Sequence, residues 1–275
     1  MRSIAAAPFA SRRRKPARAA PKTPAPAATQ AFLPGVSCGA AAVASMSPAA
    51  RRAVSQPAHH ATRTTLILLV AAPIIDAAFP AIVAAMDATA PGLDPWRHTL
   101  SRHVQAPGFP WMEVAFVMHG LAMAMLAIAL RRVPPHPWSV PAALWIACAA
   151  SFALAWLPAD EATATTLRGA LHLAVAPVAF LGVAVAGLLA WHARRREPLW
   201  RGLRRAPRVA ALFLTAALAL FGILLAVVQF TDHPRIVLGA TERLVVVGIA
   251  GWVLVEATQA GRVVGRMAGQ ATATG

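Results

Sequence analysis

Long apolar runs, separated by short polar segments, dominate the chain from residue 65 onward. Five of these runs lie at about 65–86, 111–130, 140–157, 169–191 and 209–230. As an α-helix, a run of about 20 residues crosses a hydrocarbon core of about 30 Å. Barrel strands are about ten residues long and alternate in polarity, and that alternation is absent here. Because backbone groups in lipid must bond internally, we predict transmembrane helices.

A sixth apolar run, 244–257, is too short to cross a membrane by itself. It spans if its helix covers about 236–258 and carries Glu242 and Arg243 in its outer turns. Charges near a helix end can pair or reach the interface, so we accept this helix. The predicted fold is therefore an all-α, integral membrane bundle of six transmembrane helices within 61–260, followed by a cytoplasmic tail at 261–275.

Composition supports the membrane class. Hydrophobic residues make up 58% of the 275 residues and charged residues only 13%, against about a quarter in soluble domains. Residues 1–60 are rich in Ala, Pro and Arg and have little to bury, so we predict a disordered, basic cytoplasmic tail. Met46 is an alternative translation start, which leaves the translation of residues 1–45 open.

A net charge of +16 suggests nucleic acid as a partner, but its distribution argues against one. Nine of the 26 basic residues lie in the first 60 positions, and most of the others lie in short loops between apolar runs. That pattern orients membrane proteins. We interpret the arginine-rich segment Arg194–Arg208 first as a topology determinant, with binding to anionic lipid headgroups as the alternative.

The loop charges predict one orientation. Arginines lie before the first helix, between the second and third, between the fourth and fifth, and after the sixth. The opposite loops carry the acids Asp87, Asp94, Asp160, Glu161 and Asp232. The positive-inside rule then places both termini in the cytoplasm, with the bundle in the cell (inner) membrane.

Several ionisable groups lie within the predicted helices, where they are costly. Asp76 lies roughly 15 Å below the outer surface at 1.5 Å per residue. Glu113 and His119 lie in the outer half of the second helix, and His172 lies near the outer end of the fourth. We therefore predict an outward-facing polar pocket that binds a lipid or a small ligand. The alternative is a set of structural contacts, for instance Asp76 with His119 and Glu242 with Arg243.

Three segments resemble an uncharacterised membrane family, "domain of unknown function 998". They are "PGLDPWRHTLSRHVQAPGFPWMEVAFVMHGLAM", "LPADEATATTLRGALHLAVAPVAF" and "LGATERL". The first is similar to the family's first outer loop and second helix. The second is similar to its Pro-x-Asp, spacer, Gly-x-x-His pattern, and the third to its Glu-Arg at the start of the last helix. The resemblance covers roughly residues 65–258.

The resemblance implies functional positions on the outer side of the bundle, although the family has no known activity. The positions are Asp94, Ser101, Asp160, His172, Glu242 and Arg243. Leu93 departs from the family's usual Tyr, and Arg102-His103 replaces a more acidic or neutral pair.

Two activities remain as alternatives to ligand binding. A metal-assisted lipid hydrolase would use Ser101, Asp160 and His172 as catalytic residues. Its metal ligands would come from Asp160 and from the histidines at 98, 103, 119 and 172, although no HExxH motif is present. The metal itself is unknown.

A small transporter or proton pathway would use Asp76 and His119 at mid-depth. Few polar groups lie in the cytoplasmic half, so the sequence indicates no continuous path. The predicted ligand-binding residues are Asp94, Glu242, Arg243, His119 and Asp76. No P-loop, dinucleotide, CxxC or haem motif is present, so no soluble cofactor is implied.

Overall fold

In the computed structural model, helices are the regular secondary structure of the residues that it describes. These are 48–89, 92, 94–105, 110–135, 137–157, 159–160, 166–230 and 237–273. Most of the tail predicted to be disordered, residues 1–60, lies outside these ranges, but its described part, residues 48–60, is helical. The last helix was predicted to end near residue 258, with a tail at 261–275. In the structure this helix continues through the described part of that tail, up to residue 273.

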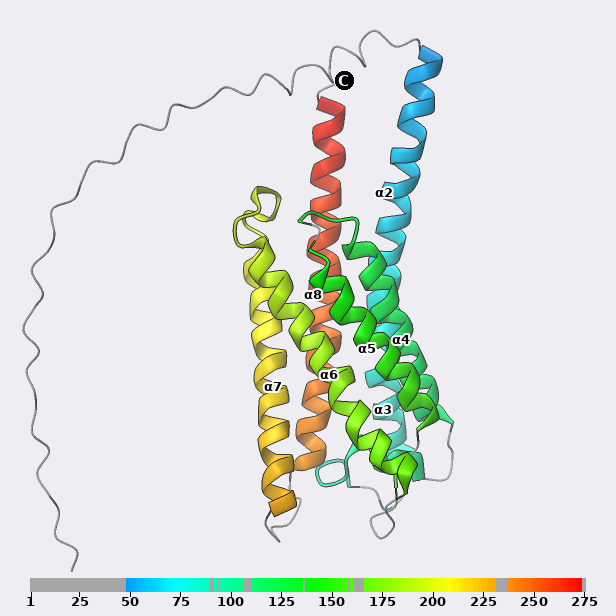
Figure 1. Cartoon of the computed structure of the whole chain (residues 1–275), viewed down its shortest axis with the longest axis vertical. Coiled ribbons are helices and arrows are strands. Elements are labelled where there is room, and N and C mark those ends of the chain that lie inside the picture. The colour runs from blue at the N-terminus through cyan, green and yellow to red at the C-terminus, as the bar shows by residue number, and fades with distance from the viewer. Residues whose placement is uncertain are drawn as a thin grey trace, which may run out of the picture. The chain divides into compact units, whose positions relative to one another are not determined.

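Seven α-helices and two 3-10 turns make up the described part of the chain (Figure 1). The α-helices are α2 (Pro48–Asp76), α3 (Ala78–Thr89), α4 (Trp111–Leu130), α5 (Ser139–Trp156), α6 (Leu167–Arg194), α7 (Arg205–Phe230) and α8 (Leu238–Ala273). The 3-10 turns are η1 (Leu100–Gln105) and η2 (Pro198–Trp200).

The described residues contain six helical segments long and apolar enough to cross a membrane. They are Thr62–Thr89, Trp111–Leu130, Ser139–Trp156, Leu167–Arg194, Arg205–Val228 and Leu238–Ala271. This confirms the predicted six-helix membrane fold, including a last helix that carries Glu242 and Arg243 in its first two turns. The protein is therefore a multi-pass membrane protein.

The first span is interrupted at one residue. It consists of α3 and part of α2, which meet at Ala77. Pro80 has no N–H, so the carbonyl of Asp76 lacks the donor that would normally bond to it four residues later. The hydrogen bonds on either side persist, since Ala77 N donates to Pro73 O at 3.0 Å and Ala81 N to Ala77 O at 3.2 Å. The break therefore lies at the level of Asp76.

Small residues let neighbouring helices pack closely. A Cβ on Gly120 of α4 would lie 3.2 Å from the carbonyl oxygen of Cys148 in α5. A Cβ on Gly182 of α6 would lie 2.9 Å from the Cβ of Ala147, also in α5. Helix α5 is thus held between α4 and α6 by contacts that only small side chains permit, as is usual for helices in lipid.

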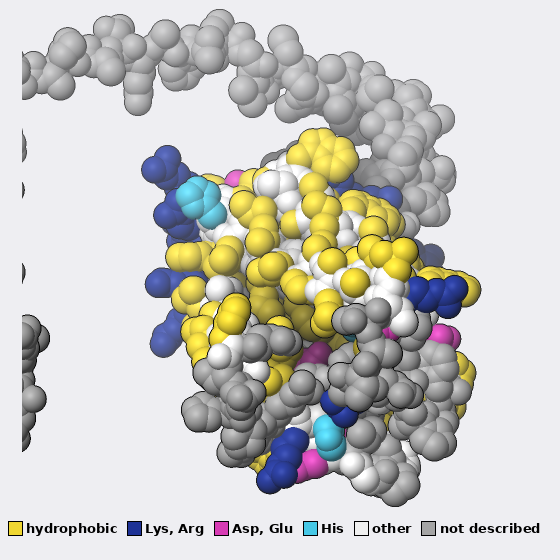
Figure 2. Space-filling view, turned by 60° about the horizontal axis from the view of Figure 1, so that its bottom comes forward, with side chains coloured by type: hydrophobic (Ala, Val, Ile, Leu, Met, Phe, Trp, Pro, Cys, Tyr) yellow, Lys and Arg dark blue, Asp and Glu magenta, His cyan; other side chains and the backbone are white. Residues whose placement is uncertain are grey.

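Large apolar side chains cover the outside of the bundle, as Figure 2 shows for one face. Ile74 of α2, Leu173 of α6 and Ile223 of α7 are 67%, 66% and 62% exposed. In water such a surface would be unfavourable, whereas in a bilayer it meets lipid tails.

The helix order gives the bundle two ends. We call one the Asp87 end, where α3, α5 and α7 end and α4, α6 and α8 begin. We call the other the Arg194 end, where the connection from α6 to α7 lies. Helix α8 continues past that connection (Figure 1).

Candidate functional site

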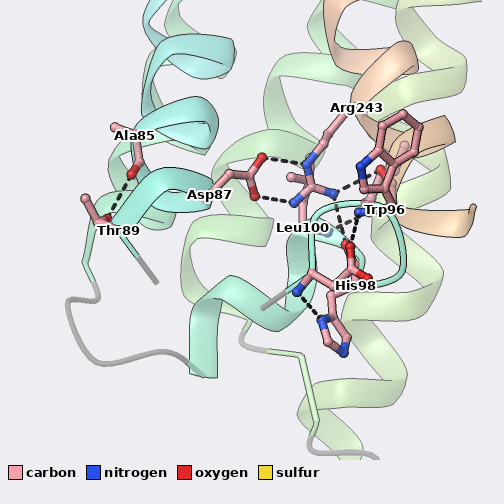
Figure 3. A network of polar contacts seen from close by, with 10 residues as sticks. Ala85, Asp87, Thr89, Trp96, His98, Leu100 and Arg243 are labelled. Carbon is pink, nitrogen blue, oxygen red and sulfur yellow. Dashed lines mark hydrogen bonds and ion pairs between the residues drawn. The ribbon is translucent and has the colours of Figure 1, made fainter. Parts of the chain in front are cut away.

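Arg243 organises the Asp87 end. It lies near the start of α8, and its guanidinium forms two hydrogen bonds with Asp87 of α3. Nε donates to Oδ2 at 2.6 Å, and Nη2 donates to Oδ1 (Figure 3). Nη1 donates to the carbonyl oxygens of His98 at 2.9 Å and Gly239 at 3.0 Å. Such a bidentate pair fixes direction as well as distance, so the first and last spans are joined at a defined angle.

Glu242 holds the adjacent segment, residues 94–105, which we call the η1 loop. Its Oε2 accepts a hydrogen bond from the backbone N–H of Leu100 at 2.6 Å. The backbone N–H of Ala240 donates to the carbonyl of Trp96 at 3.2 Å. Leu100 is buried in an apolar cluster with Phe79. The first turns of α8 therefore fasten the η1 loop onto the bundle.

This arrangement corrects the proposed contact between Glu242 and Arg243. Neighbouring residues of a helix point about 100° apart, so they do not face each other. Arg243 instead pairs with Asp87, and Glu242 instead accepts from Leu100. Asp87 was noted in the sequence only as an outer acid, and nothing local indicated a partner 156 positions away.

The η1 loop also has internal hydrogen bonds. The backbone N–H of Asp94 donates to Nδ1 of His98 at 2.8 Å, and that of Trp96 donates to Oδ1 of Asp94 at 2.9 Å. The hydroxyls of Thr99 and Ser101 lie 2.9 Å apart. Asp94 and Ser101, two of the predicted site residues, thus shape this loop.

The other two residues predicted to be catalytic lie where α5 leads into α6. Asp160 accepts hydrogen bonds from the N–H and the hydroxyl of Thr166, both at 2.6 Å. Thr166 caps α6 by accepting from Gly169 N at 3.2 Å. Nδ1 of His172 donates to the carbonyl of Leu157 at 2.7 Å. Within the described residues no hydrogen bond connects Ser101, Asp160 and His172, and their sharing of one cavity stays a prediction.

Asp76 and His119 form a buried pair inside the span. Nδ1 of His119 lies 2.7 Å from Oδ1 of Asp76, and their side chains are 1% and 2% exposed respectively. This confirms the contact proposed from the sequence. The imidazole stacks on Phe79, with ring centroids 5.5 Å apart, and Phe79 in turn contacts Phe116. Apolar side chains therefore separate the pair from the Asp87 end.

The pair is not fully satisfied. In the part of the chain that the structure describes, Oδ2 of Asp76 and Nε2 of His119 have no hydrogen-bond partner. Buried polar atoms normally have one, and exceptions mark functional positions or unseen water. Each side chain can thus accept or donate one further bond, beside the helix break at Ala77.

A second buried pair, missed in the sequence, lies toward the Arg194 end. Arg194 forms an ion pair with Glu256 of α8, and the side chains are 7% and 0% exposed. The guanidinium also lies 3.7 Å from the ring centroid of Trp200. Nε1 of Trp252 and Oε2 of Glu256 lack hydrogen-bond partners among the described residues. The sequence did not indicate this pair, because the predicted fourth helix ended at 191, before Arg194.

The residues proposed as metal ligands do not gather. Among the residues described, no three of His, Cys, Asp and Glu lie close enough to share a metal ion. The side chain of His103 lies outside the described set. His98, His119 and His172 each hydrogen-bond to a different segment.

Comparison with known proteins identifies one family. A family model described as "Protein of unknown function (DUF998)" matches residues 70–259, which include both buried pairs and the η1 loop. No curated protein and no solved structure matches the chain.

Proposed function

This chain belongs to the DUF998 family, and we propose that it is a multi-pass membrane protein that exchanges a proton or a small cation at the Asp76–His119 pair. The observation that carries this proposal is the open hydrogen-bonding capacity of Asp76 Oδ2 and His119 Nε2. Ionisable groups within a span are expensive and rare.

The helix break supports the same site. Secondary transporters bind ions near the middle of the membrane, at interrupted helices whose free carbonyls face the site. Here Pro80 leaves the backbone carbonyl of Asp76 without its helical donor. The carboxylate of the same residue lacks a second hydrogen-bond partner within the described chain. A small rotation of α3 about Ala77 would move Phe79, which covers His119.

The carboxylate and imidazole can together hold one or two protons, or a carboxylate oxygen and a carbonyl can hold a small cation. Apolar clusters lie on both sides of the pair. An ion can therefore reach the pair only if α3 moves and opens it to one side of the membrane at a time. This is the chemistry of a proton or cation pathway, which needs no gathered set of metal ligands.

Ligand binding at the Asp87 end is a second candidate, favoured by the concentration there of Asp87, Glu242 and Arg243. Each of these groups already bonds to the protein. A lipid or small ligand would therefore have to replace a protein partner, which makes this candidate the weaker one.

For orientation we propose that the Arg194 end faces the cytoplasm of the cell (inner) membrane, with both termini inside. The arginines of the α6–α7 connection support this through the positive-inside rule. Reporters fused after Gly275 and within the α5–α6 connection test it. Activity of the periplasmic reporter at Gly275 would reverse the proposed orientation.

The test of function is flux in liposomes that contain the purified full chain. A pH-sensitive dye reports proton entry under an imposed gradient, and parallel samples carry Na⁺ or K⁺ gradients with matching dyes. We expect flux above empty liposomes that is lost in Asp76→Asn and His119→Gln but retained in the control Asp94→Asn. Thermal unfolding of each variant shows that loss of flux is not loss of fold. Wild-type protein that conducts none of the three ions would overturn the proposal.

A further inference from the structure

The Arg194 end carries a cluster of arginines around the α6–α7 connection. It comprises Arg194, Arg195, Arg196, Arg201, Arg204, Arg205 and Arg208. The connection itself carries one carboxylate, Glu197, and Glu256 of α8 is already paired with Arg194. The cluster therefore keeps a strong positive charge.

Part of this cluster builds the local structure. Arg204 Nη1 donates to the carbonyl of Arg195, and Arg208 lies 5.0 Å from the ring centroid of Trp191. Trp200, beneath Arg194, donates from Nε1 to the carbonyl of Pro134 at 2.6 Å. These contacts fix the connection in place, so its remaining arginines project from a defined backbone.

Three other arginines of the cluster make none of these contacts among the described residues. Arg196, Arg201 and Arg205 are exposed, and no carboxylate within the described chain pairs with them. Beside them, Arg266 of α8 donates from Nη1 to the carbonyls of Leu199 at 2.7 Å and Arg201 at 3.1 Å. Its side chain lines a hollow of about 440 Å³ together with Pro198, Leu199, Gly269 and Gln270.

The position of this surface matters as much as its charge. The fourth span ends at Arg194 and the fifth begins at Arg205, so the connection lies at the membrane boundary. Lipid phosphates lie at that level, and a guanidinium binds phosphate through paired N–H donors. An apolar floor from Pro198 and Leu199 suits the glycerol and upper acyl part of a lipid.

We propose that Arg196, Arg201 and Arg205, with the hollow beside Arg266, bind the phosphate headgroup of an anionic phospholipid. A purely orienting role would require only positive charge at this end, at any position. A binding site requires these arginines in particular, and that difference is testable.

The test uses the full chain, purified in a neutral detergent, with short-chain phosphatidylglycerol as the probe. We expect it to bind more tightly than short-chain phosphatidylcholine. The triple variant Arg196→Gln, Arg201→Gln and Arg205→Gln should weaken phosphatidylglycerol binding by about tenfold or more. The matched control replaces Arg63, Arg132 and Arg168 by Gln. These are exposed arginines outside the connection, and their loss changes the net charge equally.

Three results would overturn the proposal. The first is equal binding of the two lipids by the wild-type protein. The second is an equal loss in the control variant, which would indicate general attraction rather than a site. The third is inorganic phosphate binding as tightly as phosphatidylglycerol, which would assign the surface to a soluble anion. Unfolding temperature, measured for both triple variants, confirms that each is folded.

Discussion

Arg243 in α8 and Asp87 in α3 face each other across the Asp87 end and join the last span to the first. Their side chains are 16% and 17% exposed, respectively. A bidentate pair shielded to this degree contributes more than a surface ion pair. The same guanidinium also holds the η1 loop through the carbonyl of His98. One side chain of α8 thus couples the last span to α3 and to the η1 loop, both distant from it in sequence.

Breaking this pair should loosen the bundle. Asp87→Asn keeps the shape but removes the charge, and we expect it to lower the free energy of unfolding by about 2 kcal/mol. Arg243→Gln should cost at least as much, because the carbonyls of His98 and Gly239 also lose their donor. Unfolding in detergent measures both. In the double variant the two losses should not add, since each single change already breaks the contact.

Glu242 offers a more local prediction. Glu242→Gln retains an oxygen that can accept from Leu100 N, whereas Glu242→Ala leaves that buried N–H without a partner at a cost of about 1–3 kcal/mol. Hydrogen exchange at Leu100 should therefore be much faster in the alanine variant than in the glutamine variant. Equal exchange in the two would mean that Glu242 does not hold the η1 loop.

The close approach of the η1 loop to α8 can be tested at Gly239. A Cβ there would lie 2.6 Å from the carbonyl oxygen of Pro95 and would also collide with the carbonyl of His98. Gly239→Ala should therefore displace the loop and increase its proteolysis. Gly251 of the same helix has open space around it. Gly251→Ala, the matched control, should be neutral or stabilise α8 by up to about 1 kcal/mol.

How much the sequence could predict varies along the chain. Apolar length predicted five spans, because lipid leaves the backbone few choices. The sixth followed only when Glu242 and Arg243 were allowed near the end of its helix. The Asp76–His119 contact was also predictable, since two ionisable groups at similar depth in adjacent helices gain by pairing. The break at Ala77 was not, because a proline in a membrane helix can be accommodated with or without a kink.

The ion pairs at the two ends of the bundle could not be predicted from the sequence. Asp87 and Arg243 are 156 positions apart, and Arg194 meets Glu256 only because α6 continues beyond its apolar run. Loop charge predicts which end a residue occupies, but not its rotation about the helix axis. The pairing of Glu242 with Arg243 was wrong for that reason.

Removing one partner of the buried Asp76–His119 pair should lower the free energy of unfolding, whereas replacing both partners by apolar residues should lower it much less. Asp76→Leu leaves His119 without its partner in an apolar site, and we expect a loss of about 3 kcal/mol. Asp76→Leu combined with His119→Phe removes both polar groups at similar volume and should recover most of that loss. Unfolding in detergent compares the two. Recovered stability with no recovery of ion flux would separate the role of the pair in function from its role in folding.

The same argument applies to the buried Arg194–Glu256 pair, but here the arginine also contacts the ring of Trp200. Glu256→Gln removes the charge that balances the buried guanidinium of Arg194, which also lies over the ring of Trp200, and we expect it to cost about 3–5 kcal/mol. Arg194→Met combined with Glu256→Leu should cost less than either single change, although the cation–π contact with Trp200 is lost. Arg132→Gln, an exposed change near the same end, serves as the control and should leave the unfolding temperature unchanged. If Glu256→Gln unfolded at the wild-type temperature, the ion pair would contribute nothing measurable to stability, and packing would account for the contact between α6 and α8.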